Sequence, residues 1–110
     1  MAKKPIEVEA GSGNVFVDLG YPDAKERRLK VELAVQVNRT LKQHGITQVQ
    51  AAKRLAIRQP HVSDLARYRL NRFSVERLLQ FLARLGKDVE IRIHERPSRR
   101  HQAVVRIHVA

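Results

Sequence analysis

The segment TQVQAAKRLAIRQPHVSDL, residues 47–65, constrains the fold more than any other part of the chain. It contains two short helical patterns with almost no residues between them. Ala51, Ala52 and Leu55 lie on the apolar face of the first pattern, and Val62, Leu65 and Ala66 lie on that of the second. Helices joined by so short a turn cross steeply, so the residues at the crossing must be small. The segment therefore predicts two tightly packed helices with Ala52 at the crossing.

The neighbouring sequence predicts further helices on both sides. Asp23, Thr47 and Ser74 are residues that commonly cap helix N-termini. Gly45 and Gly86 stand where a left-handed C-terminal cap is common. In chain order, the expected helices cover residues 24–44, 47–55, 59–68 and 74–85.

After the last expected helix, the apolar residues alternate instead of following a helical period. Val89, Ile91 and Ile93 fall on one face of an extended segment, and the alternation returns over residues 105–109. A strand is expected over residues 88–94. It can form a hairpin with the second stretch or pair with a second subunit, because a lone strand leaves both backbone edges without hydrogen-bond partners.

The length of 110 residues is typical of one domain. Residues 1–22 look like an extended arm with a few apolar anchors, residues 23–86 form the helical domain, and residues 87–110 carry the strand segment and a basic tail. Aromatic residues are only 5% of the chain, so the core must be mainly aliphatic. The expected fold is mainly α, a bundle of four to five helices with a C-terminal β-strand or hairpin.

The charge of the chain is strongly positive. Its 22 Lys and Arg residues stand against 11 Asp and Glu residues, a formal net charge of +11. Such a chain repels itself unless it has a polyanionic partner, which is usually nucleic acid. A ribosome-associated role or an acidic protein partner are the alternatives. Cysteine is absent and no apolar run approaches about 20 residues, so a cytoplasmic protein with no membrane partner is expected.

The second helix of the 47–65 segment has a polar face suited to reading DNA. Gln59, Ser63 and Arg67 are spaced four apart, so they line up along one side. Glutamine pairs with adenine through two hydrogen bonds, arginine pairs with guanine, and serine with several base edges. Asp64, at the edge of this face, repels phosphate, so it is expected to orient an arginine or to read a cytosine amino group.

Other chemistries find no support in the residue pattern. The five histidines have no metal-ligand spacing, and the Asp, Glu and Ser residues form no catalytic grouping, so we expect neither an enzyme nor a metal or other cofactor. An RNA-binding module needs exposed aromatics that stack on unpaired bases. Phe73 and Phe81, two of the five aromatic residues, occupy core-like positions instead.

The 47–65 segment resembles the helix-turn-helix of the Cro/lambda-repressor-like (XRE) family. Ala56 stands where that family has a turn glycine, so it must adopt a left-handed conformation at some cost, or the turn must differ. Arg58 replaces the usual capping serine, which removes a helix cap and adds a cation. The resemblance implies a lambda-repressor-like fold and sequence-specific binding to double-stranded DNA. The matching positions are Gln48, Ala52, Ala56, Ile57, Gln59, Pro60, Val62, Ser63 and Leu65.

Residues 12–94 also resemble a subgroup of small XRE proteins related to HigA-type antitoxins. The similarity lies in SGNVFVDLGYPDA before the long helix and in LLQFLARLGKDVEIRI at the change from helix to strand. It implies a homodimeric regulator, here expected to be a repressor that acts on an inverted-repeat operator. The alternative is an antitoxin that neutralises a RelE/HigB-like toxin by direct binding and regulates its own operon.

The helix-turn-helix arrangement gives each group of polar residues an expected role, with the first helix across the DNA backbone and the second in the major groove. The residues expected to read bases are Gln59, Pro60, Ser63, Asp64 and Arg67. Those expected to bind phosphates are Thr47, Gln48, Arg58, His61, Arg69, Asn71 and Arg72, although an ordinary solvated face is the alternative for the arginines. Dimerisation is expected through Leu78, Leu82, Val89, Ile91 and Ile93.

Overall fold

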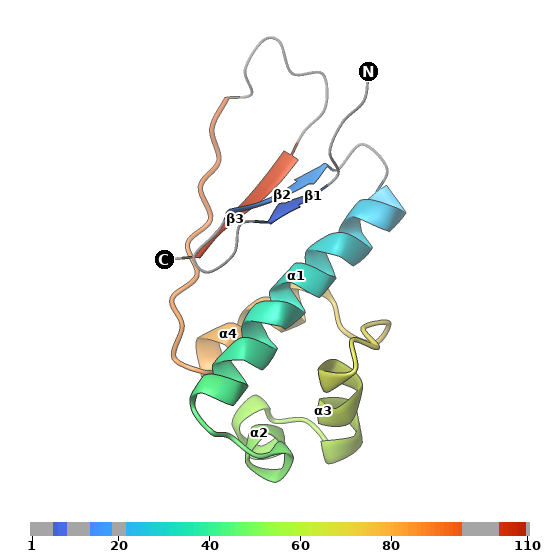
Figure 1. The fold of residues 1–110 in the computed structure, drawn as a ribbon, viewed down its shortest axis with the longest axis vertical. Helices are drawn as coiled ribbons and strands as arrows, with labels where there is room; N and C mark the ends of the chain where they lie inside the picture. The colour runs from blue at the N-terminus through green and yellow to red at the C-terminus, as the bar shows by residue number, and fades with distance from the viewer. Residues whose placement is uncertain (1–5, 9–13, 19–21, 96–103, 110) are drawn as a thin grey trace. The chain divides into compact units, whose positions relative to one another are not determined.

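The computed structural model describes residues 6–8, 14–18, 22–95 and 104–109 of the chain. Two compact units are formed, one by residues 1–29 with residues 92–110 and the other by residues 30–91. The mainly α fold, with four helices and a C-terminal strand in the described part, is confirmed. The elements in chain order are β1 (Ile6–Val8), β2 (Asn14–Asp18), α1 (Pro22–Gln43), α2 (Gln48–Leu55), α3 (Gln59–Ala66), α4 (Val75–Arg84) and β3 (Val104–His108) (Figure 1).

The three strands form one antiparallel sheet in which β2 is central. Val15 of β2 lies opposite Ile107 of β3 in the register. The alternation over residues 105–109 therefore forms a strand, as expected. The arm contributes β1 and β2, whose pairing with each other and with β3 the sequence did not indicate. The rest of the arm, residues 1–5, 9–13 and 19–21, and residues 96–103 of the basic tail lie outside the described residues.

Residues 87–95 form neither a helix nor a strand, so the strand expected over residues 88–94 is absent from the single chain. Val89, Ile91 and Ile93 are exposed by 45%, 71% and 93%. A strand needs a hydrogen-bonded neighbour, and β3 pairs with β2 rather than with this segment. Of the two pairings that the sequence leaves open for this segment, the hairpin with residues 105–109 is not formed.

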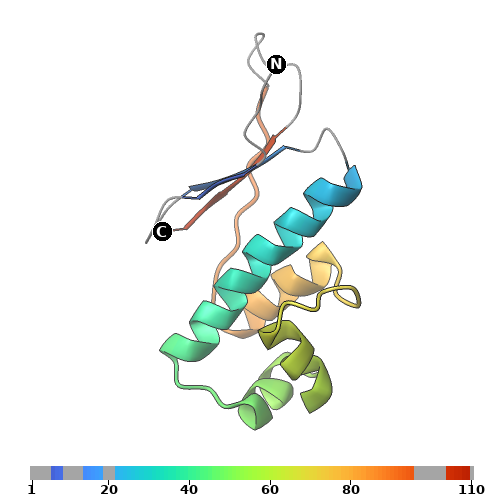
Figure 2. The same ribbon diagram turned by 45° about the vertical axis from the view of Figure 1, so that its right-hand side comes forward.

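Residues 30–91 form a helical bundle around an apolar core. Figures 1 and 2 show α2, α3 and α4 gathered around the C-terminal part of α1. Phe73 and Phe81 lie in this core, as expected, with their rings edge to face and the ring centroids 5.7 Å apart. The other buried apolar side chains are those of Leu33, Ala34, Val37, Leu41, Ala51, Leu55, Val62, Leu65, Leu70, Leu78, Leu82 and Leu85.

Leu78 and Leu82 belong to the core of their own chain. Their side chains are 0% and 6% exposed, respectively. Both were expected at a dimer interface. In the single chain they belong to the apolar core of residues 30–91, so little of either side chain is left on the surface.

The helix ends follow the expected capping residues, with one exception. The Thr47 hydroxyl accepts a hydrogen bond from the Gln50 N–H (3.2 Å), and the Gln50 side chain accepts one from the Thr47 N–H (2.9 Å), which makes a capping box at α2. The Ser74 hydroxyl accepts from the backbone N–H three residues later (3.0 Å). The exception is α1, which begins at Pro22, so Asp23 lies inside its first turn rather than before it.

Candidate nucleic-acid interface

The turn between α2 and α3 is closed by a left-handed alanine. Ala56 has φ 58° and ψ 45°. Its N–H donates to the Lys53 carbonyl (3.3 Å), and the Ile57 N–H donates to the Ala52 carbonyl (3.0 Å). These bonds satisfy carbonyls that the end of a helix otherwise leaves unpaired. Of the two alternatives that the sequence leaves open for this turn, the strained alanine is the one found.

Ala56→Gly is expected to raise the free energy of unfolding by about 1 kcal/mol, since a Cβ strains left-handed backbone and glycine has none. Ala83, an exposed residue in the last turn of α4, provides the matched control. Ala83→Gly is expected to lower the free energy of unfolding by up to about 1 kcal/mol, the cost of glycine in a helix interior. Chemical denaturation measures both changes. A loss of stability in Ala56→Gly contradicts strain at this turn.

The small residue buried at the helix crossing is Ala51 rather than Ala52. Ala51 is 1% exposed, whereas Ala52 is half-buried. Consecutive residues of an α-helix differ in direction by about 100°. The sequence pattern is therefore compatible with either Ala51 or Ala52 at the crossing. Which of the two is buried depends on how α2 packs against α3 and α4.

One face of α3 is fixed in the core and another is open to solvent. Val62 and Leu65 are 2% and 0% exposed, so they anchor the helix from behind. Ala66 was expected beside them but is exposed, and α3 ends there because Tyr68 adopts a left-handed φ of 61°. Of the residues expected to read bases, Gln59, Pro60 and Arg67 are exposed, and Ser63 and Asp64 are half-buried.

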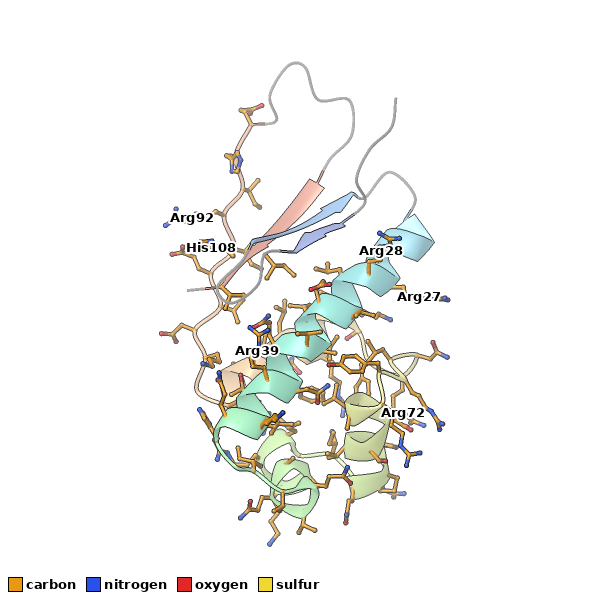
Figure 3. All side chains as sticks on the ribbon, viewed as in Figure 1. Arg27, Arg28, Arg39, Arg72, Arg92 and His108 are labelled. Atoms are coloured by element: carbon orange, nitrogen blue, oxygen red, sulfur yellow. The ribbon has the colours of Figure 1, made fainter. Side chains whose placement is uncertain are left out.

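An arginine from the loop after α3 holds the Asp64 carboxylate. The Arg72 Nε lies 3.3 Å from the Asp64 Oδ2, and Figure 3 shows Arg72 beside α3. The side chains of Arg72 and Asp64 are 51% and 26% exposed, respectively. Of the two roles expected for Asp64, the contact with an arginine is present within the single chain.

A contact that the sequence did not indicate joins α1 to the last turn of α3. The Asn38 side-chain amide donates a hydrogen bond to the Leu65 carbonyl at 3.1 Å. This bond ties the end of α3 to the longest helix of the chain. No motif marks Asn38, because its partner is a backbone group 27 residues away.

The starts of α2 and α3 present different backbone groups. At α2, the N–H groups of Gln48 and Val49 have no intrahelical partner, because they belong to its first turn. At α3, Arg58 provides no side-chain cap and Pro60 has no N–H. The N–H of His61 donates to the Arg58 carbonyl (2.9 Å). The start of α2 thus has two backbone donors suited to an anion.

The surface formed by α2, α3 and the following loop is positive. Asp64 is the only acidic residue among residues 47–74, and its carboxylate lies against Arg72. Thr47, Gln48 and Asn71, which were expected to bind phosphates, are exposed, and His61 is half-buried. The basic side chains of this stretch are all exposed, and they are those of Lys53, Arg54, Arg58, Arg67, Arg69 and Arg72.

Two other kinds of site are absent from the described residues. Among them, no three or more His, Cys, Asp or Glu side chains are grouped so that they hold a metal ion. None of the described helices is both long and apolar enough to cross a membrane. In the described part of the chain, the candidate site is the positive surface formed by α2, α3 and the following loop.

Comparisons with known proteins match the whole helical part of the chain. A family sequence model described as "Helix-turn-helix domain" matches residues 15–94. A solved structure named "Putative XRE Family Transcriptional Regulator" is similar to this chain with a TM-score of 0.78 and 44% sequence identity, over 81% of this chain and 100% of that one. No curated protein matches the sequence. The chain therefore belongs to the XRE family of helix-turn-helix proteins.

Proposed function

We propose that this chain is a transcription regulator that binds sequence-specifically to double-stranded DNA. The helix-turn-helix family match supports this proposal, as does the name of the similar solved structure. The observation that carries it is the open polar face of α3 on a positive surface, with Val62 and Leu65 anchoring the helix from behind. In this proposal α3 enters the major groove and α2 crosses the DNA backbone.

Base reading is assigned to the open face of α3 and its N-terminus. The exposed Gln59 amide is suited to two hydrogen bonds with adenine, and the exposed Arg67 guanidinium to two with guanine. The half-buried Ser63 hydroxyl is suited to several base edges. Pro60 contributes apolar contact, and Asp64 contributes through the arginine that it holds.

Phosphate binding is assigned to the residues around this face. The exposed Thr47 and Gln48 stand at the start of α2, where two backbone N–H groups have no intrahelical partner. Phosphate contacts position a protein on DNA, whereas base contacts specify the sequence. The remaining proposed phosphate ligands are Arg58, His61, Arg69, Asn71 and Arg72.

The regulator is proposed to act as a homodimer that represses transcription from an inverted-repeat operator. A two-fold axis between subunits places two α3 helices about one DNA turn, roughly 34 Å, apart. The exposed Val89, Ile91 and Ile93 are the apolar residues left for this contact once Leu78 and Leu82 are assigned to the core.

Selection of bound sequences from random duplex DNA tests the proposal. The expected result is a palindromic consensus whose half-sites are separated by about one helical turn. Absence of any enriched sequence contradicts sequence-specific binding. An enriched sequence without two-fold symmetry contradicts the homodimer and leaves DNA binding by α3 in place.

The direction in which Asp64→Ala changes DNA affinity tests the role of the Asp64–Arg72 pair. Asp64→Ala removes a negative charge from a positive surface, so simple electrostatics predicts tighter DNA binding. If Asp64 positions Arg72, we expect affinity to fall instead, by about 0.5–1 kcal/mol, the scale of a partly exposed ion pair. Fluorescence anisotropy on the selected operator measures the change. Asp64→Ala is also expected to have little further effect in an Arg72→Ala background, and a gain in affinity contradicts the positioning role.

The antitoxin alternative is supported by the HigA-type sequence resemblance alone. A test by deletion of residues 1–22 is unsuitable, because this segment contains β1 and β2 and its loss removes two strands of the sheet. If the neighbouring gene encodes a RelE/HigB-like toxin, co-expression of the full chain with that toxin is the better test. Rescue of growth together with co-purification supports the alternative, and continued toxicity contradicts it.

A further inference from the structure

Residues 87–95, with the sequence KDVEIRIHE, form an extended segment outside the core in which apolar and polar residues alternate. Val89, Ile91 and Ile93 are large aliphatic side chains at alternate positions, and Ile93 is 93% exposed. We propose that this segment pairs antiparallel with the same segment of a second copy of the chain, with Ile91 opposite Ile91 of the second copy. The inference rests on the homodimer of the proposed function and names its contact and register.

In this register, charged side chains of one copy lie opposite side chains of opposite charge in the second copy. A residue that precedes Ile91 by some number of positions lies opposite the residue of the second copy that follows Ile91 by the same number. Glu90 therefore lies opposite Arg92 of the second copy, and Arg92 lies opposite Glu90 of the second copy. The remaining opposite pairs are Lys87 with Glu95, Asp88 with His94, and Val89 with Ile93. Opposite charges facing each other across antiparallel strands are stabilising, and so are paired aliphatic side chains.

Other registers lose this match. An axis at residue 90 places two Glu90 side chains opposite each other, and an axis at residue 92 does the same with Arg92. Like charges directly opposite each other are destabilising. An axis between two residues pairs Ile91 with Glu90 or Arg92, which brings aliphatic and charged side chains onto one face. The register centred on Ile91 therefore satisfies both the apolar and the charged positions.

The start of the segment is tied to the bundle that carries α3. The Lys87 N–H donates to the Leu82 carbonyl at 3.0 Å, directly after α4. Pairing of two such segments brings the ends of two α4 helices to one axis. Because α3 and α4 belong to the same compact unit, this contact sets the separation of the two reading helices.

Two charge-reversed variants test the pairing. Glu90→Arg places two positive side chains opposite each other at both symmetric positions, and Arg92→Glu does the same with negative ones. Each variant alone is expected to dimerise about tenfold or more weakly than the wild type, since two attractive cross-strand pairs become repulsive. In an equal mixture, each introduced charge meets an opposite charge, so a dimer with one chain of each kind is expected to form. Sedimentation velocity of the full-length proteins measures all three samples.

The mixture shows whether a single variant fails to dimerise because pairing between chains is lost or because a contact within its own chain is lost. Contacts that Glu90 or Arg92 make inside their own chain are lost in the variants and are not restored by mixing. Glu76→Arg and Arg77→Glu are the matched controls, because both exposed residues lie in the first turn of α4, at the end away from the segment, and they are expected to leave dimerisation unchanged. Thermal unfolding checks that every variant is folded. Ile91→Lys is a second disrupting variant, because it places two lysines on the axis.

Three results overturn the proposal: a wild-type chain that stays monomeric, single variants that dimerise as the wild type does, or a mixture that stays monomeric. Failure here is distinguishable from failure of the proposed function. Each charge variant keeps α3 intact, so binding to a duplex with one half-site is expected to be unchanged. A variant that loses the dimer but still binds a half-site supports the inference. A selection that enriches no sequence contradicts the DNA-binding proposal and does not bear on the pairing of the segments.

Discussion

Leu65→Ala is expected to lower the free energy of unfolding by about 2–5 kcal/mol, the usual range for truncating a buried leucine. Leu65 is 0% exposed and lies on the inner face of α3. Its own carbonyl accepts the hydrogen bond from the Asn38 side chain of α1. Because the backbone at this point is held from α1, the surrounding structure cannot relax freely into the space that the side chain leaves.

Denaturant unfolding measures this loss, with Val49→Ala as the control. Val49 is 52% exposed on α2, so its truncation is expected to change the free energy of unfolding by no more than about 0.5 kcal/mol. A loss in Leu65→Ala as small as that of the control contradicts the packing of α3 described above. DNA affinity of the folded fraction is expected to fall as well, since Leu65 anchors the helix that carries Gln59.

Gln59→Ala is expected to weaken binding to the selected operator by about 1–3 kcal/mol, the value of a side chain that pairs with one base through two hydrogen bonds. Gln59 is the exposed first residue of α3, directly after the turn that Ala56 closes. Binding to random duplex DNA is expected to stay unchanged, because the amide carries no charge. Anisotropy titrations against both DNAs measure the difference, and equal losses on both contradict a base-reading role.

Arg69→Ala provides the contrast to Gln59→Ala. Arg69 is exposed in the loop after α3, and its proposed partner is a phosphate. Its loss is expected to weaken binding to operator and random DNA alike. The slope of log affinity against log salt concentration is also expected to become shallower by about one unit, because one fewer counterion is released. An unchanged slope excludes Arg69 as a phosphate contact.

Local rules account for the parts of the helical unit that the sequence predicts. Thr47 and Ser74 cap helices because their hydroxyls reach backbone N–H groups only three residues away. Gly45 and Gly86 have φ values of +64° and +86°, as expected for left-handed residues after a helix. Ala56 takes the same conformation without being glycine, which is one of the two outcomes that its place in the helix-turn-helix pattern leaves open. Such features need no knowledge of distant parts of the chain.

Contacts between distant segments account for what the sequence does not predict. Asn38 and the Leu65 carbonyl meet only once α1 and α3 are packed. Residues 88–94 have the alternation of a strand, but β2 pairs with β1 and β3 instead. The sequence pattern places Leu78 and Leu82 on the apolar face of a helix, but it does not tell whether that face packs in the core of the chain or against a second subunit. In each case the sequence shows the type of residue and its spacing, but it does not show which distant segment the residue contacts.

The proline in the second position of α3 has a consequence for how the protein searches along DNA. With Pro60 lacking an N–H and the His61 N–H already bonded, the start of α3 has few backbone groups for phosphate, whereas α2 keeps those of Gln48 and Val49. On DNA of the wrong sequence, α2 and the surrounding arginines can therefore hold the backbone while α3 makes no lasting contact. Weak, charge-driven attachment of this kind allows a protein to slide and hop along the duplex. We expect the protein to stop moving only where the residues of α3 find the bases that they read.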